Sequence, residues 1–356
     1  MLSFNPFLKA FGIDISDLRL RLVQFDKSRK HLSLRCANEI VVPQGMITNG
    51  EILNELAVAN LVKKLVEGVS GKRVRSHYVI ASLPERKTFF KVIDIPLVPE
   101  KEMAGTIRWG IEQNIPVTMD EVAYDWQVIS QDQKHATLRA AVAVIPKTIP
   151  ESYVSMLEKA GLTPVVLETE SGAIARALMP VHDELATIFV DIGASRTSLI
   201  LYDEGGIHYS STIEISGQEM TNSIARKLSL TPEQAEKAKQ ICGLDQRKGR
   251  GAVRTVVLPL LEPIFYKIDE IINFYKNSLN KKHDISIVLS GGVSQMIGME
   301  QYFKEKISLP VSIGNPAEIT PSLAKQTLIP QTHIRSFTTA VGLALRPHLS
   351  PDSMMV

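Results

Sequence analysis

One pattern occurs twice in this sequence and restricts the possible folds more than any other feature. Residues 11–26 read FGIDISDLRLRLVQFD, and residues 188–203 read IFVDIGASRTSLILYD. Each copy has an apolar run, an aspartate, a polar turn and a second apolar run that ends in another aspartate at the same spacing. The separation of the copies is far too long for a solenoid repeat. The pattern therefore predicts two similar domains, each opening with a strand, a turn and a second strand.

The turn of the second copy has the chemistry of a phosphate-binding hairpin. Asp191 ends an apolar run and could hold Mg²⁺ through its water shell. Gly193 lets the backbone approach a ligand closely, and the N–H groups of Gly193, Ala194 and Ser195 could point at phosphate oxygens. Taken alone, the stretch fits an ordinary β-hairpin with a polar turn better. The earlier copy around Asp14 is what favours a phosphate site.

Composition excludes several classes of protein. A chain of 356 residues is expected to form two or more domains. Its net charge of +2 gives no broad basic surface, so no nucleic-acid partner is expected. Two isolated cysteines, Cys36 and Cys242, form no disulfide or metal framework and fit a reducing cytoplasm. No apolar run is long enough to span a bilayer, and the first residues lack a signal-peptide core.

The periodicity of the remaining residues predicts the order of strands and helices. After the first hairpin we expect a third strand over 31–42, a helix over 52–67 and a strand that ends near 84. Residues 87–162 then read β-α-β-β-α, the pattern of a small α+β insert. A strand, a turn and a helix over 164–179 return to the first domain. After the second hairpin come helices over 217–280, a mobile loop over 245–252, a loop over 315–331 and a closing helix over 333–347.

Two further motifs could serve a nucleotide. Gly291 and Gly292 follow an apolar run, where a glycine turn lets a flat base or ribose lie against the backbone, although a simple strand-to-helix turn is the alternative. Glu236 and Lys239 share one face of a helix that Thr231 is expected to cap, with Pro232 in first position. The alternative there is an exposed ion pair of little energetic weight.

In this order, the motifs resemble the ATPase fold of actin, Hsp70 and the sugar kinases. The resemblance implies an α/β, ribonuclease H-like fold of two lobes that bind ATP and Mg²⁺ between their hairpins, with Asp14 and Asp191 at the metal. It implies that Glu236 and Lys239 contact the ribose and adenine, and that the backbone of Gly217 adds contacts. Residues 340–346, AVGLALR, resemble the closing helix of the fold, whose small residues allow close packing.

The resemblance also implies a catalytic carboxylate. Glu170 follows a predicted strand, as does the residue that faces the attacking water in this fold, and Glu168 is the near alternative. An acid at a helix N-terminus that favours the helix dipole explains Glu170 about equally well.

The first turn departs from the pattern of the superfamily. That pattern has a glycine and several hydroxyl residues after the aspartate, and then a lysine. This chain has Ser16, Asp17 and Leu18, with Arg21 at the lysine position. Ser16 could still donate through its hydroxyl and N–H groups, but Asp17 is expected to repel phosphate. We therefore expect nucleotide binding with slow or absent hydrolysis.

Within the superfamily, the sequence is most similar to the PilM family of type IV pilus assembly and more distantly to FtsA. The similarity rests on GIDIS at 12–16, PQGMITNGEI at 43–52 and, above all, IEQNIPVTMDEVAYDWQVI at 111–129 in the insert. The cleft between insert and core binds the cytoplasmic N-terminal tail of the membrane protein PilN in that family. The resemblance implies a cytoplasmic scaffold held at the inner membrane only through this partner, with pilus motor ATPases and further copies of the chain as other possible partners.

The sequence leaves alternatives for the partner pocket and for the function. Phe89, Val92, Trp109 and Ile115 are candidates for the partner pocket, although such residues more often form plain core. The alternative functions are a small-molecule kinase, for which Asp17 and Glu170 are the obvious acidic groups, and a related actin-like protein of type II secretion or division.

The predicted division of the chain follows from the same resemblance. The first lobe covers 1–87 and 164–184, and the insert covers 88–163. The second lobe covers 185–333 and includes a helical nucleotide-binding subdomain at about 217–283. Residues 334–356 provide the closing helix on the first lobe and a tail.

Overall fold

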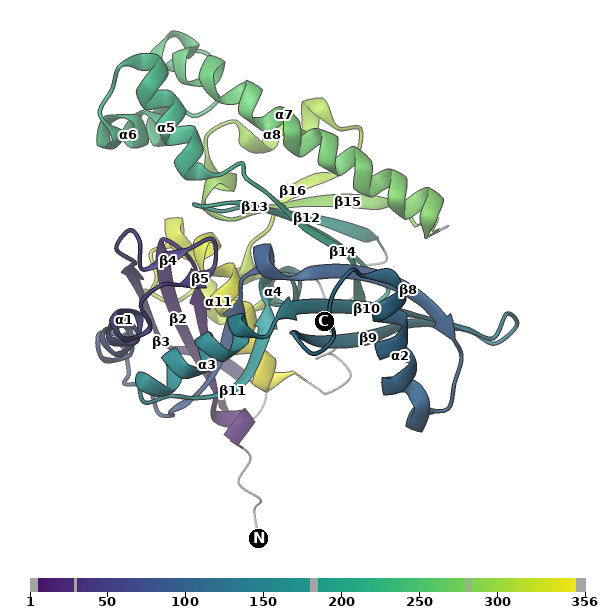
Figure 1. The fold of residues 1–356 in the computed structure, drawn as a ribbon. Coiled ribbons are helices and arrows are strands. Elements are labelled where there is room, and N and C mark those ends of the chain that lie inside the picture. Colours follow the sequence, from purple (N-terminus) through teal and green to yellow (C-terminus); the bar gives the residue numbers. More distant parts are fainter. Residues whose placement is uncertain (1–5, 29–30, 180–184, 280, 282, 350–356) are drawn as a thin grey trace.

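Two sheets with the same strand order form the frame of the protein (Figure 1). The computed structural model describes residues 6–28, 31–179, 185–279, 281 and 283–349. In each sheet, the first strand pairs antiparallel with the second, which pairs antiparallel with the third, and parallel strands follow on the other side. The duplicated α/β fold that the repeat predicted is thereby confirmed.

Each strand of the second sheet has a counterpart in the first sheet, which has one further strand at its edge. The first sheet runs β11-β7-β1-β2-β3-β6 and the second β16-β15-β12-β13-β14. In the first sheet the bounds are β1 (Phe11–Ile15), β2 (Arg19–Ser28), β3 (His31–Val41), β6 (Ser70–Gly71), β7 (Tyr78–Leu83) and β11 (Thr163–Thr169). In the second they are β12 (Ala186–Ile192), β13 (Thr197–Asp203), β14 (Gly206–Ile213), β15 (Ile285–Ser290) and β16 (Val311–Ile313). Asp14 and Asp191 therefore end equivalent strands.

Helices on the outer face of the first sheet close one core. They are α1 (Glu55–Glu67) and α3 (Thr148–Lys159), which pack on each other and on the strands. The helix predicted from residue 52 begins at Glu55 because the Asn54 side chain accepts the N–H of Ala57 and caps it.

Two helices lie between the sheets. They are α4 (Glu170–Leu178) and α11 (Thr338–Leu345), whose apolar side chains share one core with Val23 and Phe25 of the first sheet and Phe189 and Ile200 of the second. The helix α11 also packs on β1. The two lobes are thus joined by a continuous apolar layer directly beneath the two hairpins.

The second lobe carries its helices on the face away from the first lobe (Figure 1). They are α5 (Gly217–Leu228), α6 (Pro232–Cys242), α7 (Ala252–Asn273) and α8 (Met299–Lys306). The predicted cap of α6 is confirmed, because Thr231 and Gln234 form a reciprocal capping box and Pro232 is the first helical residue.

Two predicted loops contain short helices. A 3₁₀ turn over Lys248–Gly251 leads directly into α7. In the other loop, α9 (Pro316–Ile319) and α10 (Pro321–Ala324) each begin at a proline, whose fixed φ suits the first helical position. None of the described helices is long and apolar enough to cross a lipid bilayer.

The insert is a separate three-stranded sheet with one helix. It comprises β8 (Phe89–Pro96), α2 (Glu100–Asn114), β9 (Val122–Asp132) and β10 (Thr137–Pro146), in the antiparallel order β8-β10-β9. Ile93, Ile107 and Val142 are among the residues of its own core.

The predicted insert included α3, but the structure places this helix elsewhere. Tyr153, Met156 and Leu157 of α3 belong to the core of the first sheet. The periodicity could not reveal this, because it shows which face of a helix is apolar and not which sheet covers it. The division of the chain stays a prediction, and its boundary at 184 and the tail beyond 349 lie outside the described residues.

Candidate functional site

Asp14 lies at the end of β1 with little access to solvent. The Ser82 hydroxyl donates to its carboxylate at 3.3 Å, and Arg21 of β2 approaches to 3.5 Å. Ser82 in turn accepts the N–H of Ile15 at 2.9 Å, which ties the turn to β7. Burial raises the pKa of Asp14, and the guanidinium groups of Arg21 and Arg196 oppose this rise.

Asp191 occupies the equivalent place in the second lobe. Burial raises the pKa of Asp191, a hydrogen bond with Ser290 lowers it, and the nearby charge of Asp14 raises it further. The two hairpin turns therefore face each other closely enough for their carboxylates to interact. Two buried carboxylates, one of which feels the charge of the other, are suited to binding a cation.

The residues of the first turn are engaged within the fold. The N–H and hydroxyl groups of Ser16 both donate to the carbonyl of Arg19, at 3.0 and 2.9 Å, and so close the turn. The carboxylate of Asp17, which was expected to repel phosphate, accepts the N–H groups of Asn49 and Gly50 at 3.0 and 2.9 Å. These belong to the small hairpin of β4 (Ile47–Thr48) and β5 (Glu51–Ile52).

Arg21, at the position of the usual lysine, is also held in place. Its Nε donates to Glu39 at 2.6 Å, and its guanidinium lies 5.7 Å from the centroid of the Phe337 ring. Arg19 binds the other oxygen of Glu39 at 2.8 Å. The positive charge of Arg21 is thus shared between Asp14 and Glu39.

The second turn docks on the N-terminus of α5. The N–H of Gly193 donates to the carbonyl of Arg196 at 2.9 Å and closes the turn. The carbonyls of Gly193 and Ala194 accept the N–H groups of Gly217 and Gln218 at 2.9 and 3.0 Å. The turn, with its exposed tip at Ala194, therefore lies at the positive end of a helix dipole.

Glu236 and Lys239 of α6 lie beside the second turn and the N-terminus of α5, and these residues together form one wall of the candidate site. Lys239 donates to the carbonyl of Gly217 at 2.9 Å and to Thr221 at 2.8 Å, and it pairs with Glu236 at 2.7 Å. The predicted ion pair is present, with Lys239 buried and the Glu236 side chain 43% exposed. Burial favours a higher pKa for Glu236, but hydrogen bonds from Lys239 and Thr221 lower it below its usual value.

The glycine turn after β15 completes this wall. Gly291 has φ of +81°, and a Cβ there would lie 2.4 Å from the carbonyl oxygen of Ile192, so only glycine allows the contact with the second hairpin. A Cβ added to Gly292 would meet no atom within 4 Å, which shows open space on that side. A Cβ on Gly217 would lie 2.9 Å from Val293 and 3.5 Å from Nζ of Lys239. The predicted residues of the second lobe are thus brought together.

Glu170 is the first residue of α4 and forms a buried ion pair with Arg196 of the second turn. Burial raises the pKa of Glu170 to about 8, while Arg196 opposes the rise and the charge of Asp14 adds to it. Arg196 was absent from the predicted site, although an arginine inside the turn sequence GASRTS was the signal available.

A second missed residue, Glu85, connects the lobes. It lies in a 3₁₀ turn (Glu85–Lys87) after β7 and accepts the N–H of Ser171 at 3.1 Å and the hydroxyl of Ser210 on β14. Nothing in the sequence around Glu85 indicated this role, because both partners are far away in the chain.

The alternative carboxylate, Glu168, belongs to a different network. Arg176 donates to its two oxygens at 2.7 and 2.9 Å and to the carbonyl of Gly342 at 3.0 Å, and Arg346 also binds Glu168. Glu168 therefore has a structural role beneath α11, and of the two acids Glu170 is the one beside the hairpin turns.

The four residues predicted for a partner pocket differ in their exposure to solvent. Phe89 and Trp109 are 48% and 54% exposed, whereas Ile115 lies in the core of the insert. Val92 is partly buried against the core of the second lobe. Phe89 and Trp109 therefore remain as surface candidates.

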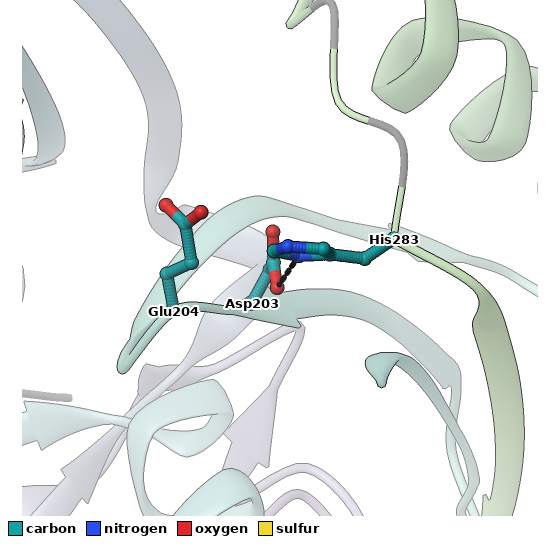
Figure 2. Close-up of side chains that lie close together, drawn as sticks. All are labelled: Asp203, Glu204 and His283. Carbon is teal, nitrogen blue, oxygen red and sulfur yellow. Dashed lines mark hydrogen bonds and ion pairs between the residues drawn. The ribbon is translucent and has the colours of Figure 1, made fainter. Parts of the chain in front are cut away.

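A separate cluster lies at the far end of the second hairpin. Figure 2 shows the ring of His283 against the carboxylate of Asp203, at 3.1 Å, with Glu204 beside them. The ligand atoms of the three residues lie within 4.8 Å of one another. Tyr275 already donates to Asp203 at 2.8 Å, and Lys281 pairs with Glu204. These contacts explain the cluster as an ion-pair network that joins the hairpin to the segment before β15.

Comparisons with known proteins agree with this architecture. The family described as "Type IV pilus assembly protein PilM" matches residues 12–348. The cell division protein FtsA of Pseudomonas aeruginosa is 28% identical over 176 residues, which cover 44% of this chain and 42% of FtsA. The chain spans about half the length of the FtsA proteins that it matches most strongly.

Two solved structures share the fold over most of the chain. The "PilM-PilN type IV pilus biogenesis complex" has a TM-score of 0.80 at 24% identity and covers 97% of this chain and 100% of that chain. MreB5 of Spiroplasma citri bound to ADP has a TM-score of 0.53 at 14% identity, covering 89% of this chain and 96% of that chain. The two-lobed actin-like ATPase fold predicted from the hairpins is confirmed by these likenesses.

Proposed function

The chain belongs to the family of the type IV pilus assembly protein PilM, and we propose that it is an ATP-binding scaffold that docks a PilN-like inner-membrane protein. The single observation that supports nucleotide binding is the wall formed by Gly193, Gly217, Lys239 and Gly292 opposite Asp14. A protein of the same fold, MreB5, is described as bound to ADP.

The residues present fit a magnesium nucleotide. Mg²⁺ prefers carboxylate oxygens and water, which Asp14 and Asp191 would supply from opposite lobes. The dipole of α5 favours a phosphate near the second turn, although the N–H groups of Gly217 and Gln218 are themselves bound to the carbonyls of that turn. The open side of Gly292 leaves room for the base or ribose, with Glu236 and Lys239 close by.

Hydrolysis is proposed to be slow. Glu170 is the residue suited to orient a water molecule, because it is buried beside both turns. Its ion pair with Arg196 occupies the carboxylate and would have to loosen before Glu170 could orient a water molecule.

Calorimetry on the wild type and on Asp191→Ala tests nucleotide binding. We expect the wild type to bind Mg–ATP and the substitution to weaken binding at least about 100-fold, because one of two metal-facing carboxylates is lost. Asp120→Ala is the matched control, since the Asp120 side chain is 90% exposed in the insert. Absence of binding by the folded wild type would contradict the nucleotide proposal and leave a docking scaffold.

The partner proposal rests on the family and on the edges of the insert. A structure of the same fold is described as a PilM–PilN complex. In the described sheet of the insert, β9 pairs only with β10, so its outer edge can accept an added strand. Phe89, the first residue of β8, and Trp109 on α2 are exposed and offer apolar contact. Attachment through this partner would place the protein at the cytoplasmic face of the inner membrane.

A fluorescent peptide that carries the N-terminal tail of the PilN-like partner tests docking by polarisation. We expect saturable binding that Phe89→Ala weakens about tenfold or more, because exposed aromatic anchors dominate such interfaces. Tyr266→Ala removes an exposed aromatic ring from α7 in the other lobe and should leave the affinity unchanged. A wild-type protein that fails to bind the tail, or equal losses in the two variants, would argue against this docking site.

No observation favours the alternative of a small-molecule kinase. Asp17, one of its two acidic groups, is occupied by the N–H groups of Asn49 and Gly50, and the other, Glu170, is paired with Arg196. Both groups are thus already engaged in contacts within the fold.

A further inference from the structure

We propose that Arg196 distinguishes ATP from ADP in this protein, by exchanging Glu170 for the terminal phosphate of ATP. This inference rests on the proposed nucleotide site and adds the residue that reads the third phosphate. The carbonyl of Arg196 closes the second turn, and the side chain of Arg196 reaches Glu170 on α4.

Arg196 has hydrogen-bonding capacity to spare. A guanidinium offers five N–H groups, and the contact with Glu170 uses one terminal nitrogen. Among the described residues, Nε of Arg196 has no hydrogen-bond partner, and the side chain is only 10% exposed. Nε of Arg176 is likewise without a partner among the described residues, but the other two nitrogens of Arg176 bind both oxygens of Glu168 and a carbonyl, whereas only one nitrogen of Arg196 is bound. The site around Arg196 is thus left with unused donors that an anion would satisfy.

The charges around Arg196 allow such an exchange. Burial disfavours the charged guanidinium, but the carboxylates of Glu170, Asp17 and Asp14 keep the pKa of Arg196 above its usual range. A cation that neutralises Asp14 would weaken this attraction. A phosphate then competes with Glu170 for the guanidinium, and planar bidentate pairing with phosphate favours arginine in that competition.

Arg21, the other arginine of the cleft, is less free to respond. Its Nε is bound to Glu39 at 2.6 Å, and its guanidinium lies over Phe337. Moving Arg21 would break this hydrogen bond and leave Glu39 with Arg19 alone. Within the described part of the chain, the side chain of Arg196 is bound to Glu170 alone, so it is the arginine suited to respond to a ligand.

Affinities for Mg–ATP and Mg–ADP, measured by calorimetry, test the inference. In Arg196→Gln we expect ATP affinity to fall at least about tenfold while ADP affinity changes less than about threefold, because the lost pair is charge-assisted and specific to the third phosphate. Arg254→Gln, an arginine of α7 that donates to the carbonyl of Leu244 at 3.0 Å, is the matched control and should change neither affinity. Equal losses for ATP and ADP, or no loss, would overturn the assignment.

A second variant covers the case in which Arg196→Gln does not fold. Glu170→Gln removes the charge that holds Arg196, so we expect tighter ATP binding with unchanged ADP binding. A change of the same size for both nucleotides would contradict the exchange. Binding of ADP by the wild type tests the nucleotide site itself. If the wild type binds both nucleotides but neither variant changes the preference for ATP, only the role of Arg196 is refuted.

Discussion

Gly342→Ala is expected to destabilise the protein by about 3 kcal/mol or more, at the upper end of the cost of overpacking a core. Gly342 lies in α11 where this helix crosses α4 between the two sheets. A Cβ there would lie 1.8 Å from the carbonyl oxygen of Ala173 and 2.5 Å from its carbonyl carbon. These are backbone atoms, so no change of rotamer relieves the clash, and α11 must move away from α4. Chemical denaturation would measure the loss in the free energy of unfolding.

Gly105→Ala is the matched control for this prediction. Gly105 lies in α2, and a Cβ added there would meet no atom within 4 Å. The same chemical change should stabilise the protein by up to about 1 kcal/mol, because alanine is the better helix former. If the two substitutions had similar effects, the close crossing of α11 and α4 would be wrong.

Glu168→Gln is expected to cost about 3–5 kcal/mol, the range for breaking a buried ion pair by removing one partner. The glutamine fills nearly the same volume, but it leaves the guanidinium groups of Arg176 and Arg346 without their shared counter-charge. Arg176 is almost fully buried, so water cannot replace the lost interaction. Thermal and chemical denaturation would both register the change.

The surface pair of Glu300 and Lys304, at 2.6 Å, provides the comparison. Glu300→Gln should cost less than about 1 kcal/mol, because solvent screens exposed pairs. A loss in Glu168→Gln no larger than that of Glu300→Gln would show that the network beneath α11 contributes little. The comparison also separates Glu168, which acts on the fold, from Glu170, whose substitution is predicted to act on nucleotide affinity.

The elements that could be predicted from the sequence are those with local signals. The two hairpins follow from apolar runs broken by Asp14 and Asp191, and the cap of α6 follows from Thr231 and Pro232, all within a few residues. The order of the motifs along the chain predicted that Gly217, Lys239 and the glycine turn belong to one site. The structure brings these residues together because β12, β14 and β15 of the second sheet run in the same direction and end at the same edge, and because α6 packs on α5.

The features that sequence reasoning missed depend on partners far apart in the chain. Glu85 meets Ser210, Arg196 meets Glu170, and α3 packs on the first sheet and not on the insert. Each side chain could have formed other pairs, and only the packing of both lobes selects one.

The sequence by itself thus determined the repeated strands, the turns that end them and the family to which the chain belongs. Apolar periodicity and turn chemistry act over short distances, so they can be read along the chain. The tertiary structure decided which charges meet beside the two hairpin turns. Arg196 became a buried partner of Glu170, and the Asp17 carboxylate accepts the N–H groups of Asn49 and Gly50, because such contacts depend on distances that arise only when the chain packs.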